Sequence, residues 1–152
     1  MPKYETFLCV GDNHGDMCDP VAFSGLKEFI KDFKPKHRIH LGDCFDFRSI
    51  RRGVSNSDNE SHESLIDDVE SGTEFIEAMK PTAFLYGNHE DRLHQMMTGS
   101  NSGVVRDYAY DLDCKIKSIL RSNGCKTILP YHADKGVYRV GPITAVHGYT
   151  CG

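Results

Sequence analysis

Three apolar runs of this chain end in the same way, with a glycine followed by a side chain that can bind a metal ion. The endings are Gly11-Asp12-Asn13-His14, Gly42-Asp43 and Gly87-Asn88-His89. Short apolar runs that stop at such turn residues predict strands. Residues just past strand ends gather at one edge of an α/β sheet, where ligands usually bind. The repeated ending therefore constrains both the fold and the position of a site.

A fourth run, Ile143–Val146, ends in His147-Gly148. The glycines allow sharp turns and a close approach of the backbone to a bound group. Taken singly, an aspartate after a strand is an ordinary helix cap and Gly-Asn an ordinary turn. Taken together, the carboxylate, imidazole and amide groups form a mixed ligand set that suits Mn²⁺, Fe or Zn²⁺ better than Ca²⁺ or a structural zinc. The residues expected to meet are Asp12, His14, Asp43, Asn88 and His147.

Between the strand-like runs, apolar residues recur at helical spacing, which indicates an α/β fold. Helices are predicted over 21–33, over 65–79, and along a stripe from Tyr108 to Leu120 that stops at Asn123-Gly124. Polar loops are predicted at 53–60 and 98–103. The predicted strands are 4–10, 38–41, 82–86, 126–129, 136–140 and 143–147.

Length and composition fit one globular domain over residues 1–152, with 39% apolar and 26% charged residues. There is no apolar run long enough to cross a membrane and no signal-peptide core at the N-terminus. The six cysteines form no disulfide-like framework. We therefore expect free thiols and a cytoplasmic protein.

The formal charge of −4 argues against a passive nucleic-acid binder, although it does not exclude an enzyme that grips phosphate through metal ions. The stretch 31–52 is nevertheless basic and ends in Arg48, Arg51 and Arg52. Either it is a solvated surface or it forms a rim that attracts phosphate, and the sequence leaves both interpretations open.

The ordered motifs resemble a known family, the calcineurin-like metallophosphoesterases. The resemblance rests on Asp12-x-His14, Gly42-Asp43, Gly87-Asn88-His89-Glu90 and His147-Gly148, and it spans residues 6–149. It implies two packed β-sheets flanked by helices and a site for two divalent metal ions, with Mn²⁺ as first choice and Fe or Zn²⁺ as alternatives. By resemblance, Asp43 bridges the ions, Asp12 and His14 hold the first, and Asn88 and His147 hold the second.

The resemblance also implies the chemistry. A metal-bridging hydroxide would attack the phosphorus of a phosphate mono- or diester in line. The substrate could be a nucleotide or a nucleic acid. His89 would act as general acid at the leaving oxygen or stabilise its charge. Asp46 matches the carboxylate that orients this histidine in the protein-phosphatase branch, although a helix N-cap is an equal interpretation.

One departure from the family pattern concerns the substrate phosphate. Phe47 stands where the protein-phosphatase branch has its phosphate-gripping arginine, and Arg48 comes one position late. This argues against phosphoprotein substrates. Asn88 and Arg48 are candidate phosphate contacts, and so is Arg92, for which an ordinary surface position on a helix is an equal interpretation.

A second departure is that the family's G-H-x-H signature does not occur between His147 and Gly152. That signature gives each metal one further histidine. Three explanations stay open: a shortened natural product, a fragment, or completion by another residue such as His132 or by another chain. An exposed sheet edge would then favour a homodimer or a completing C-terminal chain. The alternative function is a weakly active or inactive metal-binding remnant or assembly component.

Overall fold

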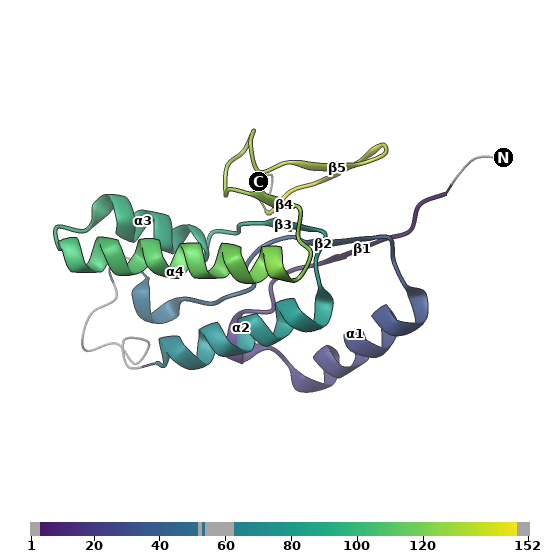
Figure 1. Ribbon diagram of the computed structural model, residues 1–152, viewed down its shortest axis with the longest axis horizontal. Coiled ribbons are helices and arrows are strands. Elements are labelled where there is room, and N and C mark those ends of the chain that lie inside the picture. The colour runs from purple at the N-terminus through teal and green to yellow at the C-terminus, as the bar shows by residue number, and fades with distance from the viewer. Residues whose placement is uncertain (1–3, 52, 54–62, 149–152) are drawn as a thin grey trace.

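The computed structural model describes residues 4–51, 53 and 63–148. Its centre is a parallel sheet in the order β1-β2-β3-β4 (Figure 1). The strands are β1 (Phe7–Val10), β2 (His37–His40), β3 (Ala83–Leu85) and β4 (Thr127–Leu129). Because all four run in one direction, their carboxyl ends lie at the same edge of the sheet.

The four α-helices of the described residues lie on one face of this sheet (Figure 1). Parallel strands that follow one another in sequence need crossovers, and right-handed crossovers in one direction place every helix on the same side. The helices are α1 (Pro20–Phe33), α2 (Leu65–Met79), α3 (Asp91–Gly99) and α4 (Gly103–Ser122). Two short 3₁₀ turns, Gly15–Met17 and Arg48–Ile50, follow β1 and β2.

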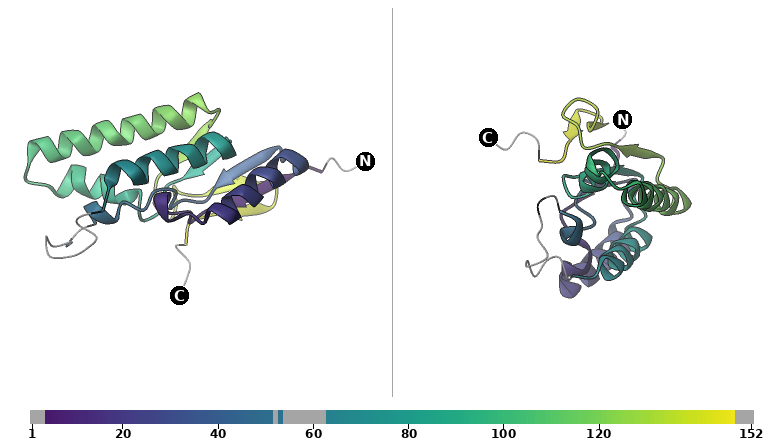
Figure 2. Two further views of the ribbon diagram at one scale, coloured as in Figure 1. Left: turned by 90° about the horizontal axis from the view of Figure 1, so that it is seen from below. Right: turned by 90° about the vertical axis from the view of Figure 1, so that its left-hand side faces the viewer.

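The opposite face of the sheet is covered by an antiparallel hairpin of β5 (Tyr138–Val140) and β6 (Ile143–Ala145) (Figures 1 and 2). The sheet therefore has two cores. A large one faces the helices, with Phe84, Ile116 and Leu120 fully buried, and a small one places Ala145 of the hairpin against β2 and β3. The predicted α/β class with two sheets is confirmed.

Most predicted elements are present; five of the strands are shorter than expected, and β2 has the expected length but begins one residue earlier. The helix over 65–79 has the predicted bounds, and Ser64 caps it by accepting the N–H of Asp67 at 3.1 Å. Helix α3 was not predicted, and the predicted loop at 98–103 is wrong at its ends, because only 100–102 lie outside helices. Of the predicted loop at 53–60, all but Gly53 lies outside the described residues.

Two further expectations concern the whole chain. Five cysteines in the described ranges have free thiols, and Cys151 lies outside those ranges. No helix among the described residues is long and apolar enough to cross a membrane.

Candidate metal centre

Three loops meet at the carboxyl edge of the parallel sheet, and backbone hydrogen bonds tie the first to the second. The N–H groups of Asp12, His14 and Gly15 donate to the carbonyl groups of residues 42, 43 and 44 at 3.0, 3.0 and 2.8 Å. The loop after β1 thus runs beside the loop after β2. This pairing places side chains that are about thirty positions apart in the sequence within reach of one another.

Three of the expected ligands have left-handed backbone conformations. The φ angles are 58° at Asp12, 49° at His14 and 53° at Asp43. Such a conformation costs an L-residue on the order of 1 kcal/mol and persists only where surrounding contacts enforce it. Here the interloop hydrogen bonds enforce it, and strain concentrated at one loop cluster is typical of a functional site.

Two glycines make the close approach of the loops feasible. At Gly42, with φ +110°, a Cβ would lie 2.6 Å from the backbone nitrogen of Gly87 and 2.7 Å from Nδ1 of His147. At Gly87, a Cβ would lie 2.1 Å from Oδ1 of Asp43. Any side chain at either position would push the candidate ligands apart.

The first expected ligand group is brought together. Asp12, His14 and Asp43 each offer a ligand atom within 4.8 Å of the others. The Nδ1 of His14 lies 2.9 Å from Oδ1 of Asp46 and donates its proton there. The lone pair of His14 is therefore on Nε2, which lies 3.9 Å from Oδ1 of Asp12, as a metal-binding imidazole requires.

The second expected group also converges. Nδ1 of His147 lies 2.8 Å from the carbonyl oxygen of Leu41, which only accepts, so the proton is on Nδ1 in the neutral ring. The other nitrogen, Nε2, then points its lone pair at Oδ1 of Asn88, 3.0 Å away, and at Oδ2 of Asp43, 3.4 Å away. Acceptors that face one another in this way need a proton or a cation between them.

Electrostatics agrees with that geometry. The hydrogen bond with Asp43 raises the pKa of His147. Burial favours a higher pKa for Asp43, but His147 and the N–H of His89 outweigh burial and lower it. Asp43 is buried while Asp12 and Asn88 are exposed, so Asp43 lies at the floor of a site that opens to solvent.

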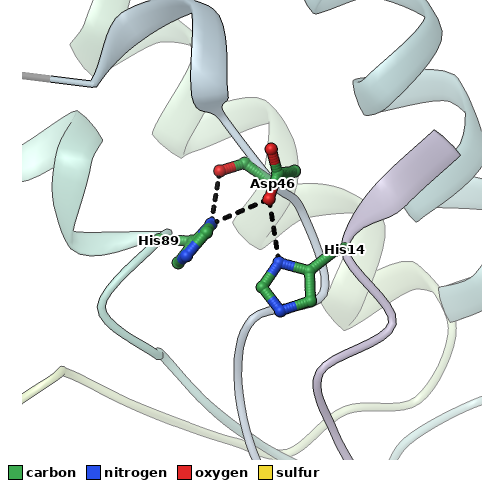
Figure 3. A group of neighbouring side chains, drawn as sticks. All are labelled: His14, Asp46 and His89. Atoms are coloured by element: carbon green, nitrogen blue, oxygen red, sulfur yellow. Dashed lines mark hydrogen bonds and ion pairs between the residues drawn. The ribbon is translucent and has the colours of Figure 1, made fainter. Parts of the chain in front are cut away.

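His89 lies beside these groups and forms, with His14 and Asp46, a second group whose ligand atoms lie within 4.8 Å of one another. Its Nδ1 donates to the carbonyl oxygen of Asp46 at 2.5 Å and lies 3.1 Å from Oδ1 of the same residue (Figure 3). Asp46 thus holds the rings of both His14 and His89. It is not a helix N-cap, because Phe47 occupies that position of the following 3₁₀ turn.

The two arginines predicted to contact phosphate have different surroundings. Arg48 makes a two-pronged ion pair with Asp16, at 2.8 and 2.7 Å, and also pairs with Glu63. Arg92 donates to the carbonyl oxygen of Asp46 at 2.8 Å and to Nε2 of His89 at 3.2 Å. Arg92 therefore lies at the histidine expected to serve the leaving group, while Arg48 is paired with acidic side chains.

The structure also explains the departure at position 47. The ring of Phe47 is fully buried and stacks on Phe45, with centroids 5.3 Å apart. Phe47 is thus part of the helix-side core and offers the site no polar group. His132, considered as a replacement ligand, accepts the N–H groups of Asp134 and Lys135 at Nδ1 and serves as a loop cap.

Sequence reasoning missed two buried polar groups under the site. His40 accepts the N–H of Gly42 at Nδ1 and donates from Nε2 to Asn13, whose amide in turn donates to the carbonyl of Cys44. Glu90 accepts backbone N–H groups from two loops; burial raises its pKa, and these backbone donors oppose the rise by stabilising the ionised carboxylate. The signal for Glu90 was its place in the fourth position of the Gly87 motif.

Comparison with protein families agrees with this geometry. The family model described as calcineurin-like phosphoesterase matches residues 5–150. No curated protein and no solved structure matches the chain. The chain therefore belongs to the calcineurin-like phosphoesterases, a family of metal-dependent phosphoester hydrolases.

Proposed function

We propose that this chain is a dinuclear metal-dependent phosphoesterase that hydrolyses phosphate mono- or diesters. The observation that carries the proposal is the convergence on Asp43 of lone pairs from both sides. His14 and Asp12 approach Asp43 from the loop after β1, while His147 and Asn88 approach it from the chain after β6 and the loop after β3. The Asp43 carboxylate has about four acceptor positions, enough to serve both groups as well as the N–H of His89.

The donor set fits two divalent cations. Each proposed site combines carboxylate oxygen with imidazole nitrogen, and the second adds the amide oxygen of Asn88; Mn²⁺ suits this set, with Fe or Zn²⁺ as alternatives. When bound, such ions supply Lewis acidity toward the phosphate and activate water as the nucleophile. Both histidine tautomers are already set by hydrogen bonds from Nδ1, so little reorganisation is needed.

The remaining groups serve the leaving oxygen. Asp46 fixes the ring of His89, whose Nε2 lies 3.9 Å from Oδ2 of Asp43 and therefore faces the proposed metal site. In this structure Nε2 accepts from Arg92; if the ring takes up a proton at Nε2 in place of that bond, it would give this proton to the leaving oxygen. The guanidinium of Arg92 lies 3.2 Å from the same nitrogen, close enough to share a phosphate oxygen with it.

The proposed substrates are small or general phosphate esters, including nucleotides and nucleic-acid ends. The basis is the buried Phe47, which leaves the phosphoprotein-type arginine position without a cation. Arg48, its neighbour, is already neutralised by Asp16. Recognition of the phosphate therefore depends on the metal ions, Asn88 and Arg92.

The test combines metal binding with turnover. After dialysis against Mn²⁺ and removal of free ion, the wild-type chain should retain about two ions per chain. It should hydrolyse p-nitrophenyl phosphate or its bis ester with Mn²⁺ present, and Asp43→Ala should lose both properties. Asp107→Ala, which removes an exposed carboxylate of α4, is the matched control and should keep both. Full activity in Asp43→Ala would refute the bridging role.

A further inference from the structure

Glu90 is a buried carboxylate that lies between the two ligand loops. It is 1% exposed and immediately precedes α3. Its hydrogen bonds in the described part of the chain go to backbone N–H groups. A buried carboxylate is costly unless its lone pairs are used, so this position requires a physical explanation.

The explanation is a nest of four backbone N–H donors around the carboxylate. Oε2 accepts the N–H of Asp43 at 2.9 Å and that of Gly87 at 2.7 Å. Oε1 accepts the N–H of Cys44 at 2.8 Å and that of Phe45 at 3.1 Å. An ionised carboxylate offers about four acceptor positions, and all of them are filled here. Three of the donors belong to the loop after β2, and one belongs to the loop after β3.

A second bond joins the same loops in the opposite direction. The backbone N–H of His89 donates to Oδ1 of Asp43 at 2.9 Å. The Glu90 carboxylate thus accepts the backbone N–H of Asp43, while the Asp43 carboxylate accepts the backbone N–H of His89. The two loops are interlocked through two charge-assisted hydrogen-bond systems, each stronger than a neutral one.

We infer that Glu90 is a positioning residue that sets the separation between Asp43 and Asn88. The inference rests on the proposed two-ion site, in which these residues hold the shared and the second position. Metal–ligand distances tolerate only about 0.2 Å of error, so a loop that drifts against its neighbour loses the site. Glu90 acts through the backbone and touches no substrate.

Glu90→Gln tests this role because it keeps the shape and removes the charge. The amide oxygen of the variant side chain can accept one pair of N–H groups, but its amide nitrogen then points donors at the other pair. Half of the nest is lost, and donors face donors. Because supporting groups of this kind commonly change metal affinity by about 10- to 100-fold, we expect Mn²⁺ binding to weaken at least tenfold.

The chain offers a matched control in Asp68 of α2, which is 3% exposed. Asp68 accepts the N–H groups of Asp46 and Phe47 at 2.9 and 2.7 Å. It therefore supports the same loop after β2 without reaching the loop after β3. Asp68→Asn should lower stability, as loss of any buried carboxylate does, and should weaken Mn²⁺ binding less than Glu90→Gln does, because it reaches the proposed ligand His14 only through Asp46.

The experiment has one readout without metal and one with it. In the metal-free full chain, amide hydrogen exchange measured by NMR should show protection at residues 43–45 and 87. Glu90→Gln should lose protection at both loops, whereas Asp68→Asn should lose it at 46 and 47. Calorimetric titration with Mn²⁺ then compares the affinities of the three proteins.

Two results would overturn the inference: rapid exchange at 43–45 and 87 in the wild type, or equal Mn²⁺ affinity in the Glu90 and Asp68 variants. If Glu90→Gln does not fold, the wild-type exchange pattern decides together with Glu90→Asp, which keeps the charge and should retain part of the affinity. A wild-type chain that binds no Mn²⁺ refutes the proposed function instead. Hydrogen exchange in the metal-free chain then decides by itself whether Glu90 holds the two loops together.

Discussion

Gly87→Ala probes how tightly the site depends on the approach of two loops. The new Cβ would lie 2.6 Å from the backbone nitrogen of Asp43, whereas ordinary contact begins at 3.4 Å. The backbones must therefore separate by the difference, about 0.8 Å, which exceeds the roughly 0.2 Å tolerance of a metal site fourfold. The side chain of Asp43 cannot absorb this shift, because the clash involves its backbone.

We expect two consequences of this separation. Overpacking of this kind costs about 1–3 kcal/mol of unfolding free energy, which urea denaturation of the metal-free chain would measure. Mn²⁺ affinity should fall by at least about tenfold, equivalent to roughly 1.4 kcal/mol, and calorimetry would measure it. The fold itself should persist, because the two main cores do not include position 87.

The matched control is Gly25→Ala in α1, where a Cβ meets nothing within 4 Å. Replacing a helix-interior glycine by alanine should stabilise the chain by about 0.5–1 kcal/mol and leave metal binding unchanged. If Gly87→Ala binds Mn²⁺ as tightly as the wild type does, the loops are not held at the distance that the structure gives, and the reasoning is wrong.

Two further predictions concern stability. Burial lowers the pKa of His40 to about 3, below the unfolded value, so the unfolded chain takes up this proton first and stability falls as the pH drops from about 6.5 toward 3. The unfolding free energy, measured by urea denaturation at each pH, should change with pH more steeply in the wild type than in His40→Gln, by up to about 1.4 kcal/mol per pH unit over that range. The same pH dependence in both proteins would exclude a buried neutral imidazole. Asp19 accepts the N–H groups of Val21 and Ala22 at 2.8 Å each, so Asp19→Ala should lose about 1 kcal/mol in the same assay with Mn²⁺ binding unchanged; an unaltered midpoint would show that another group caps α1.

The motif order predicted much of the candidate site because strand ends have a fixed geometry. Once Val10, Leu41 and Tyr86 are recognised as close to strand ends, parallel pairing brings Asp12, Asp43 and their neighbours to one edge. This argument needs only local patterns and a general rule of sheet topology. The roles of the site residues, the number of ions and the substrate stay predictions.

Among the helices, too, one was predicted from its sequence pattern and another was not. The helix over 65–79 was predicted with its bounds from apolar residues that recur at helical spacing, and the structure adds Ser64 as its N-cap. Helix α3 was not predicted, since its sequence carries only a weak apolar stripe, with Leu93 as its buried residue. Packing against α4, rather than its own pattern, holds α3 in place.

The amino-acid sequence by itself determined the alternation of strands and helices, the ligand types at the strand ends and the membership of the family. Only the tertiary structure decided what supports those ligands. The four bonds of Glu90, the bond from His40 to Asn13 and the pairing of Arg48 with Asp16 all join groups at least three positions apart, and most of them join residues more than twenty apart. A buried carboxylate or imidazole looks in a sequence like any surface one, because the difference lies in which backbone groups the fold turns toward it.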